Sequence, residues 1–523
     1  MNVNNALQVI ETKYSFEFKE KQIEAINSIV NGKDTFIVLP TGYGKTKIYS
    51  HLPEIYGLLN NMMGTILVIS PLQSLMLDQV AKMSAIGIDA TIVGECQPDK
   101  SVATQILKGD FGIVFSSPEA ALTPGMWRKC FTSGVFRDNL KAVVIDEAHC
   151  ITEWGGEFRQ EYSRLGELRS ICPDDVTFVA LTATATKSIR TQILKKLDMI
   201  EKEVTTVYQL PDRQNIMYTV KKSRNNFIEL QWLLDDIVKN KFNAKKTVVY
   251  CRNIATCANL YEHFSMNINQ CDNITERLVA MYHRSTAKLN KDHVLEEFPK
   301  NNSKLRLVFA TVAFGMGVDI PDIDYVVHWG APRGLEQFAQ ECGRAGRDGR
   351  QSQSIVYFTG HDIAKDRSSP EMRDFCKSTS CLRHAMNSHF KLDTCSDSDS
   401  TDKPNSDLCR CCCVCFNSCK CGGCVPLECI MDFASEMPPS DVYDNSVRNL
   451  DECKLKLLKA NLMDFQECLI EENSEDVNAF DASLIECIVT NCNYLLCEDD
   501  IIDLGLLNNE LSKEIFLLIE EVC

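Results

Sequence analysis

The sequence of 523 residues has no apolar run close to the roughly 20 residues that a bilayer-spanning helix needs. Residues 1–5 contain neither a basic cluster nor a hydrophobic core, which argues against a secretory signal. Positive charge is not in excess, because 72 acidic residues outnumber 55 basic ones and give a net charge of −17. We therefore expect an intracellular protein that binds nucleic acid, if at all, through a local groove rather than through bulk charge.

Charge and cysteine are both distributed unevenly along the chain. Residues 376–523 hold 11 basic and 28 acidic residues, so this tail carries the whole net charge and residues 1–375 sum to zero. Eighteen of the 26 cysteines lie from Cys376 onward, and eight of these fall between Cys409 and Cys424. Clustered cysteines in an intracellular chain favour a metal site over disulfide bonds. Small buried residues are the alternative, but thiols at every second or third position cannot all be core.

The length and the ordinary apolar fraction of 45% predict roughly three domains. Short runs that are apolar throughout alternate with helical patterns up to residue 366, as in parallel sheets buried on both faces. The expected strands are 35–39, 65–70, 113–116, 142–146 and 177–181, and then 247–250, 307–310, 325–328 and 355–358. No strong pattern persists around 205–215, which we interpret as a link between two α/β domains.

Beyond residue 366 the chain is expected to be largely helical. Residues 367–392 have a helical pattern, whereas the polar, repetitive stretch 393–408 is typical of a flexible insertion. Residues 440–523 are acidic but carry apolar residues at helical spacing. These spaced positions include Leu455, Leu458, Leu462 and Phe465. We expect a small helical module there, with a protein-interaction or regulatory role.

A strand ending at Leu39 leads into a glycine-rich turn, residues 40–46, and then into a helical pattern. Glycines let backbone N–H groups wrap a phosphate chain, while Lys45 can neutralise β- and γ-phosphate oxygens and Thr46 can ligate Mg²⁺. Leu39 stands at the first glycine of the strict G-x4-G-K-T pattern, so the turn alone leaves an ordinary glycine-rich loop as an alternative. The expected nucleotide-binding residues of this turn are Thr41, Gly42, Tyr43, Gly44, Lys45 and Thr46.

A second apolar strand ends in Asp146 and Glu147, within the tetrapeptide Asp-Glu-Ala-His. Asp146 can hold Mg²⁺ through water, and Glu147 can orient and deprotonate the attacking water. Burying two acids at the end of a strand costs free energy, which would be unexpected if their role were only structural. Together with the glycine-rich turn they predict a site of ATP hydrolysis.

The turn and the Asp-Glu-Ala-His segment resemble the superfamily-two helicases, and further motifs from about Tyr14 to Cys415 resemble the RecQ family of DNA helicases. The resemblance implies an α/β protein with two tandem RecA-like parallel-sheet domains, at 1–206 and 207–366, and a helical zinc-binding subdomain at 367–425. The acidic C-terminal module at 426–523 is expected from its composition and lies outside the resemblance. It also implies ATP, Mg²⁺ and Zn²⁺ as cofactors and single-stranded, 3′-tailed or forked DNA as partner. The implied activity is ATP-dependent 3′→5′ DNA unwinding in repair, recombination or replication.

Residues 14–22 resemble the adenine-binding motif of the family. The resemblance implies that Phe18 and Lys19 stack on adenine and that Gln22 reads its edge, since an amide donates and accepts at once. Lys19 stands where the family usually has arginine, and its point charge stacks less well than a planar guanidinium group.

Residues 310–321 and 340–349 resemble motifs V and VI of the family. The resemblance implies that Asp319 contributes to the ATP site and that Gln340 belongs to the catalytic set. Arg344 and Arg347 are three residues apart and share one helical face. The resemblance implies that Arg347 is the finger on the transferring phosphoryl group and Arg344 its companion on the γ-phosphate. A surface ion-pair helix is the alternative.

Several other segments resemble the strand-contacting and coupling motifs of the family. Residues 150–162 resemble its aromatic-rich DNA-sensing loop, but Gly156 stands where the family has histidine, which would weaken the coupling of DNA binding to hydrolysis. Residues 182–186 resemble the motif that links the γ-phosphate region to the DNA through His149. The expected DNA-binding or coupling residues are Ser70, His149, Trp154, Phe158, Arg159, Thr182, Thr184, Arg252, His283 and Thr311.

The cysteine cluster resembles the RecQ zinc site. The resemblance implies the four ligands Cys381, Cys409, Cys412 and Cys415. Four thiolates make a closed structural site without an open catalytic position. The register remains open, because other thiols offer rival ligands: Cys411, Cys413, Cys419, Cys421 and Cys424.

RecQ proteins usually continue into a basic winged-helix domain, and the acidic residues 426–523 show no such pattern. One alternative function is therefore a DNA-stimulated ATPase that translocates with little unwinding. Another is an adaptor that binds ATP only as a structural ligand, although the intact Lys45, Asp146, Glu147 and Arg347 argue against it. The expected location is nuclear for a eukaryotic member and otherwise cytoplasmic, although no strong basic localisation run is present.

Overall fold

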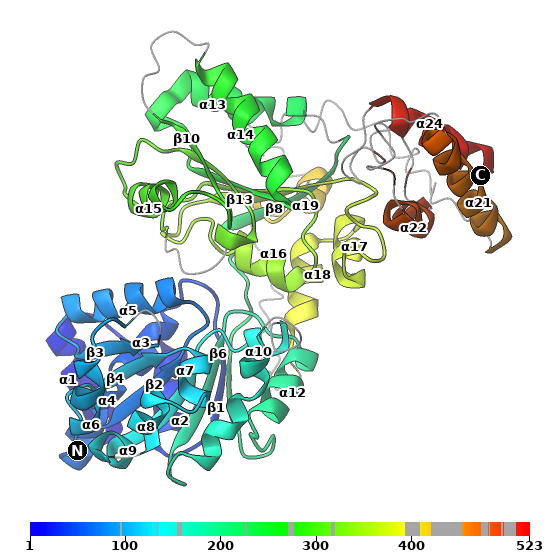
Figure 1. The fold of residues 1–523 in the computed structure, drawn as a ribbon. Coiled ribbons are helices and arrows are strands. Elements are labelled where there is room, and N and C mark those ends of the chain that lie inside the picture. The colour runs from blue at the N-terminus through cyan, green and yellow to red at the C-terminus, as the bar shows by residue number, and fades with distance from the viewer. Residues whose placement is uncertain are drawn as a thin grey trace.

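The computed structural model describes residues 1–94, 97–132, 134–153, 159–224, 227–269, 277–314, 320–392, 408–419, 452–471, 480, 482–492, 495, 501 and 509–522. Over these residues the chain forms two parallel sheets, each sandwiched between helices, which lie one above the other in Figure 1. Each sheet has a separate hydrophobic cluster on each of its two faces. This is the arrangement that the apolar strands predicted.

The first sheet has the strand order β3-β4-β2-β5-β6-β1-β7, with every neighbouring pair parallel. Its strands are β1 (Thr35–Val38), β2 (Thr65–Ile69), β3 (Ala90–Val93), β4 (Ile113–Ser116), β5 (Leu140–Ile145), β6 (Thr177–Thr182) and β7 (Thr205–Tyr208). β1 and β5, which carry the glycine-rich turn and the two acids at their carboxyl ends, flank β6 in the middle of the sheet. The order therefore brings the two motifs together from about 100 residues apart in the chain.

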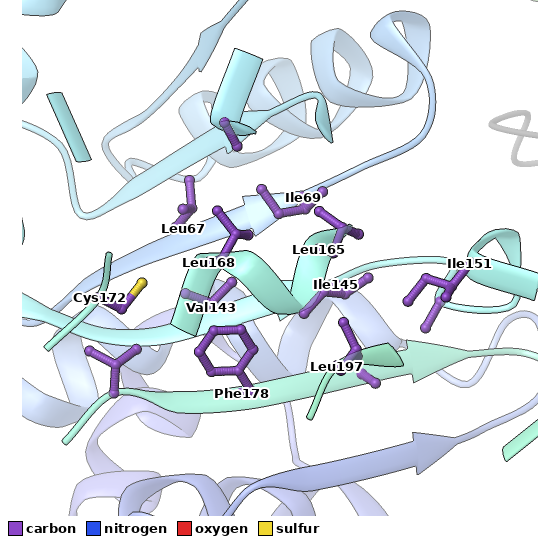
Figure 2. Close-up of a cluster of buried hydrophobic side chains, with 14 of the residues drawn as sticks. Leu67, Ile69, Val143, Ile145, Ile151, Leu165, Leu168, Cys172, Phe178 and Leu197 are labelled. Carbon is purple, nitrogen blue, oxygen red and sulfur yellow. The ribbon is translucent and has the colours of Figure 1, made fainter. Parts of the chain in front are cut away.

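Helices cover both faces of this sheet. They are α1 (Val3–Tyr14), α2 (Glu20–Val30), α3 (Lys45–Ser50), α4 (Leu52–Asn60), α5 (Gln73–Ala85), α6 (Ser101–Lys108), α7 (Pro118–Leu122), α8 (Met126–Thr132), α9 (Gly134–Asn139), α10 (Cys150–Glu153), α11 (Gln160–Ser163), the 3-10 helix η1 (Leu165–Ser170) and α12 (Lys187–Lys196). On one face, side chains of three central strands meet those of η1 (Figure 2): Leu67, Ile69, Val143, Ile145, Phe178, Leu165 and Leu168. Burial of these apolar side chains fixes the strand ends that carry the site.

The second sheet has the order β10-β11-β9-β12-β13-β8 and is also parallel throughout. Its strands are β8 (Ile216–Lys222), β9 (Thr247–Cys251), β10 (Val279–Tyr282), β11 (Leu307–Ala310), β12 (Tyr325–Trp329) and β13 (Ser352–Phe358). Its main helices are α13 (Gln231–Asn240), α14 (Ile254–Asn269), α15 (Lys288–Glu297) and α16 (Leu335–Cys342). Motif VI begins on α16 and runs into the loop before β13, which carries its arginines towards the first domain.

The link between the two domains is shorter than the sequence predicted. β7 pairs with β1 in parallel, with Thr205 opposite Thr35, and so belongs to the first sheet. The expected boundary between residues 206 and 207 therefore lies inside a strand, and the linker spans 209–215. The strand escaped prediction because it is an edge strand whose first two threonines are only half-buried, so it is not apolar throughout.

The expected helix over 367–392 is two helices, α17 (Pro370–Cys376) and α18 (Leu382–Phe390). They are followed by the 3-10 helix η6 (Leu408–Arg410) and by α19 (Cys413–Ser418). A parallel bridge joins Tyr218 of β8 to Cys412, and Leu382 of α18 belongs to the core of the second domain. The subdomain is thus attached to the edge of the second sheet. Residues 393–407 of the expected insertion lie outside the described residues.

The described part of the acidic module contains three helices, α21 (Glu452–Glu471), α22 (Ala482–Asn491) and α24 (Asn509–Val522). They form a core of their own that includes Leu458 and Leu462, with Leu455 and Phe465 packed against it. The prediction of a small helical module from these four spaced residues is confirmed. Within the described part of the chain, no helix combines the length and the apolar character needed to cross a membrane.

Candidate functional site

The glycine-rich turn connects β1 to α3, which begins at Lys45. Gly42 and Gly44 have φ angles of +79° and +92°, which side-chain-bearing residues rarely adopt. A β-carbon on Gly44 would also lie 2.8 Å from Gln22 Nε2, so a larger residue would have to displace the end of that side chain as well as adopt a strained backbone. Lys45 Nζ donates a hydrogen bond to the carbonyl of Leu39 at 3.0 Å, which folds the side chain back over the turn. The ammonium group is thus held where a phosphate chain would be wrapped.

Asp146 and Glu147 follow β5 directly, beside this turn. Asp146 is 8% exposed and accepts a hydrogen bond from Tyr49 Oη at 3.4 Å. Burial, and then the neighbouring charge of Glu147, raise the pKa of Asp146, while Lys45 opposes the shift. Burial also lowers the pKa of Lys45, and both carboxylates oppose that shift. One cation and two acids therefore share one small space.

This donor set fits Mg²⁺. Tyr49 interacts with the Thr46 hydroxyl as well as with Asp146, so the two expected magnesium ligands lie on either side of one buried phenol. Two adjacent carboxylates that disfavour each other's charge are an arrangement that a divalent cation relieves. Thr46 and Asp146 would hold the ion at this position.

The second domain touches the glycine-rich turn directly. Thr41 Oγ1 donates to the carbonyl of Gly343 at 2.9 Å, and a β-carbon on Gly343 would lie only 2.5 Å from that hydroxyl. Arg347 Cγ lies 3.8 Å from the point where a β-carbon of Gly42 would stand, and its charge acts on the pKa of Lys45. Gly343 is a site residue that sequence reasoning missed, although it belongs to the Gly-Arg-Ala-Gly-Arg segment. The guanidinium-bearing loop and the lysine turn therefore face each other where the two domains meet.

Arg344, the expected companion of Arg347, lies in the interior of the second domain. It is 6% exposed and interacts with the hydroxyl of the buried Tyr250 on β9. Glu341, one turn before it on α16, is bonded to His328 Nε2 at 2.9 Å. Arg344 is thus anchored in the second domain, and its contact with a γ-phosphate remains a prediction.

A polar chain crosses between the domains. Glu147 Oε2 lies 3.4 Å from His149 Nδ1, which lies 3.1 Å from Thr182 Oγ1. Thr182 Oγ1 donates to the carbonyl of Thr184 at 2.9 Å. Gln340 Nε2 of the second domain donates to Thr184 Oγ1 at 3.2 Å. The candidate base is therefore connected to motif VI through His149, Thr182 and Thr184, which the sequence had grouped as coupling residues, with one link made by the backbone carbonyl of Thr184.

The expected adenine-binding residues support the turn instead. Gln22 Oε1 accepts from the Lys19 backbone N–H at 2.8 Å, and Gln22 Nε2 donates to the carbonyls of Tyr43 and Gly44 at 3.2 and 2.9 Å. Lys19 Nζ stacks over the Tyr43 ring at 4.6 Å from its centroid, and Phe18 is buried. Gln22 would have to exchange these partners to read adenine, so that role remains a prediction.

The expected DNA contacts gather at the carboxyl ends of strands. Ser70, Arg252, His283 and Thr311 follow β2, β9, β10 and β11. Arg252 Nη1 donates to the carbonyl of Asp362 at 2.8 Å and to its carboxylate at 3.1 Å. Arg159 makes a paired bond to both carboxylate oxygens of Glu119, at 2.8 and 2.9 Å. Both arginines therefore have protein partners, which DNA phosphates would have to replace. Trp154, Phe158 and Asp319 lie outside the described residues.

The cysteine-rich segment forms a compact four-sulfur group. The Sγ atoms of Cys381, Cys411, Cys412 and Cys415 all lie within 4.8 Å of one another. Cys381 Sγ and Cys411 Sγ are 3.6 Å apart, close to the about 3.8 Å that tetrahedral zinc with bonds of about 2.3 Å requires. The donor set fits a closed structural zinc site.

The structure differs from the predicted ligand set at one position, with Cys411 in place of Cys409. Tyr218 N donates to the Cys411 carbonyl at 3.3 Å, and the bridge between Tyr218 and Cys412 holds the adjacent backbone against β8. Cys409 lies in η6 with its sulfur 3.0 Å from that of Cys419. The Cys-x-x-Cys spacing carried no information on this pairing with β8, which is why sequence reasoning left Cys411 as a rival only.

We expect Cys411→Ser to lose bound zinc and to unfold at a lower temperature, because only three thiolates of the tetrahedron remain. Cys409→Ser is the matched control and should retain the metal. Zinc content by plasma mass spectrometry and thermal unfolding of both full-length variants test this ligand set. Zinc loss from Cys409→Ser together with retention by Cys411→Ser would refute it.

Two further arginines hold the linker, and sequence reasoning assigned no role to either. Arg213 lies in the linker and donates to the carbonyl of Gly346 in motif VI. Arg383 of α18 forms an ion pair with Asp212. It also donates to the carbonyl of Arg213 at 3.0 Å and to that of Cys411 at 3.4 Å. The linker is therefore held from one side by the cysteine-rich subdomain. In the sequence, Arg213 is a charged residue in a segment without a helix or strand pattern. Its charge was the only signal of a possible role.

Comparison with known proteins assigns these features to a family. The DEAD/DEAH box helicase domain matches residues 19–192, and the helicase conserved C-terminal domain matches residues 229–349. The chain is 34% identical over 350 residues to the ATP-dependent helicase SGS1 of Saccharomyces cerevisiae, covering 66% of this chain and 23% of that protein. It is 31% identical over 369 residues to the ATP-dependent DNA helicase RecQ of Haemophilus influenzae, covering 69% and 54%. The chain belongs to the RecQ family of helicases.

A third RecQ relative, the RecQ-like DNA helicase BLM of Xenopus laevis, is 31% identical over 396 residues and covers 73% of this chain and 27% of its own length. The chain thus spans between about a quarter and about half the length of these three relatives. Among solved structures, helicase MrfA bound to DNA and AMPPNP has a TM-score of 0.54 at 19% identity, over 69% of this chain and 50% of that one. At that identity the likeness concerns the fold of the RecQ-family core alone.

Proposed function

We propose that this RecQ-family chain is an ATP-dependent DNA helicase that hydrolyses ATP between its two RecA-like domains and moves 3′→5′ along single-stranded DNA. The observation that carries the proposal is the contact across the cleft, where Arg347 and Gly343 of one domain meet Gly42 and Thr41 of the other. The names of the relatives, which describe ATP-dependent helicases, support it. Strand polarity rests on the family resemblance.

In this proposal each residue of the cleft has a defined task in hydrolysis. Lys45 and the N–H groups of the turn bind the phosphate chain. Thr46 and Asp146 would hold Mg²⁺, which would neutralise phosphate charge. Glu147 accepts the proton of the attacking water, and Arg347 stabilises the charge that develops on the γ-phosphoryl group. The left-handed backbone of Glu147, with φ of +49°, is a strained conformation of the kind found at functional positions.

The polar chain from Glu147 to Gln340 supplies the coupling in this proposal. When the second domain shifts along DNA, Gln340 shifts with it, and Thr184, Thr182 and His149 pass the displacement towards the base. The zinc site has no open position and so takes a structural role. Roles in repair or recombination, and a protein partner for the acidic module, are part of the same proposal.

Limited unwinding is the second candidate function. It is favoured by Arg159 and Arg252, which are bonded to Glu119 and Asp362 and so are less available to DNA phosphates. Such a protein would hydrolyse ATP in response to DNA and translocate, while separating strands poorly. The two candidate functions use the same ATP site. They differ in whether the DNA strands are separated.

The test measures ATP hydrolysis with and without single-stranded DNA, and then unwinding of 3′-tailed and 5′-tailed duplexes by the same preparation. We expect DNA-stimulated hydrolysis and unwinding of the 3′-tailed substrate only, because a RecQ-type motor loads on the 3′ strand. Stimulated hydrolysis without strand separation would select the translocase. Absence of turnover under all conditions would select a protein that binds ATP without hydrolysing it.

A further inference from the structure

Arg213 occupies an unusual position for a linker residue. It lies between β7 of the first sheet and β8 of the second, yet its Nη1 atom is 3.8 Å from the point where a β-carbon of Gly42 would stand. The side chain of Arg347 lies at the same distance from that point. The two guanidinium-bearing side chains therefore flank the same glycine of the phosphate-binding turn, one from the linker and one from motif VI.

The hydrogen-bond acceptors of Arg213 are all neutral carbonyls, although the more distant charge of Asp348 opposes the lowering of its pKa. Its guanidinium group donates to the carbonyls of Gly343 and Ala345 at 3.5 Å and to that of Gly346. Burial is the main cause that lowers the pKa of Arg213, so the cation has lost part of its water. Arg383, the other arginine of this region, is paired with a carboxylate. Among the described residues no carboxylate lies within ion-pair distance of Arg213.

A cation that has lost part of its water is costly unless an anion lies beside it, so a position facing a phosphate-binding turn favours an anionic partner. The weak, long bonds to Gly343 and Ala345 leave part of the guanidinium fork available for stronger acceptors. Phosphate oxygens are the acceptors that this planar fork matches best, since charge-assisted bonds are about twice as strong as neutral ones. The nucleotide that the turn would hold supplies them at the right place.

We propose that Arg213 is a ligand of the ATP phosphate chain, a third cationic group beside Lys45 and Arg347. The inference rests on the proposed function, because it assumes that the glycine-rich turn binds ATP. It also gives the linker a direct contact with the nucleotide. Loss of the γ-phosphate would change the bonds of Arg213 and, through the carbonyl of Gly346, the position of the motif VI loop.

The alternative is that Arg213 only anchors the motif VI loop, and the chain offers a matched control for it. Asn215 donates to the same carbonyl of Gly346 at 2.9 Å and to that of Arg350 at 2.7 Å. It lies two residues further along the same linker and carries no charge. A pure anchoring role predicts that the two positions behave alike.

The experiment compares Arg213→Gln and Asn215→Ala, both built into a Glu147→Gln background so that bound ATP is not consumed. Dissociation constants for fluorescent ATP and ADP analogues and thermal unfolding midpoints are measured for each chain. We expect Arg213→Gln to weaken ATP binding on the order of 10- to 100-fold, the usual effect of losing a charge-assisted bond, and to weaken ADP binding less if the γ-phosphate is its main partner. Asn215→Ala should change affinity less than about threefold, as a neutral bond outside the nucleotide site would.

Equal effects of the two substitutions on ATP affinity, scaled by their effects on the unfolding midpoint, would overturn the inference in favour of anchoring. Arg213→Lys should recover part of the ATP affinity by restoring the charge without the fork, which an anchoring role does not predict. Normal nucleotide binding by the Glu147→Gln parent, combined with absent turnover in the native chain, would contradict the proposed function without touching this inference. Failure of the parent to bind ATP would overturn both.

Discussion

Replacement of Lys45 by alanine is expected to lower the rate of ATP hydrolysis by a factor on the order of 10² to 10³, the usual cost of removing one preorganised donor from a charge-stabilising site. The ammonium group lies over the glycine-rich turn, bonded to the carbonyl of Leu39 and opposed by Asp146 and Glu147. Without it, the β- and γ-phosphate oxygens lose the cationic side chain that the glycine-rich turn supplies. The measurement is steady-state phosphate release in the presence of single-stranded DNA.

Lys47 provides the control for this substitution. It lies two residues later on the same helix, and its ammonium group stacks over the Phe16 ring at 4.1 Å from the centroid instead of facing the acids. Lys47→Ala should retain most of the activity, so a loss restricted to Lys45→Ala cannot be attributed to damage of α3. Turnover retained by Lys45→Ala would show that the phosphate chain binds elsewhere.

The sequence predicted the interior of both sheets and missed their margins. All nine expected strands lie inside the two sheets, where burial on both faces demands apolar residues at every position. The remaining four strands of the described residues are β3, β7, β8 and β10, which are the four edge strands. With a neighbour on one side only, β7 begins with two half-buried threonines and β8 ends in two lysines. An apolar-run criterion does not detect β7 and β8 for this reason.

The candidate site shows the same division between local and non-local information. Lys45, Asp146 and Glu147 could be found because each stands next to a strand end within a short motif. Arg213 was missed and Cys411 was left as one rival ligand among several, because their importance depends on contacts with segments distant in the chain: motif VI for the arginine and β8 for the cysteine. The spacing of motif residues indicated which groups face a site. The partners that other elements contribute could be identified only in the structure.

The effect expected for Arg347→Ala is larger still than that for Lys45→Ala. Arginines supplied across a cleft to a transferring phosphoryl group contribute about 10³- to 10⁵-fold to the rate. Arg347 lies against Gly42 and close enough to Lys45 to act on its pKa, so it already faces the glycine-rich turn from the second domain. We therefore expect kcat to fall by about that factor while ATP affinity changes far less, since charge on the γ-phosphoryl oxygens is redistributed only in the transition state.

Arg350 is the matched control, three residues further along the same loop. Its side chain is exposed and paired with Asp348 and Asp324, at 2.6 and 3.6 Å, on the outside of the second domain. Arg350→Ala should leave kcat within about threefold, as expected for the loss of exposed ion pairs. If Arg347→Ala raised the dissociation constant for ATP as much as it lowered kcat/KM, the guanidinium group would be a binding contact of the ground state. A motor that closes on its nucleotide to hydrolyse it requires the opposite result. Its second domain must stabilise the transition state of phosphoryl transfer more than it stabilises bound ATP.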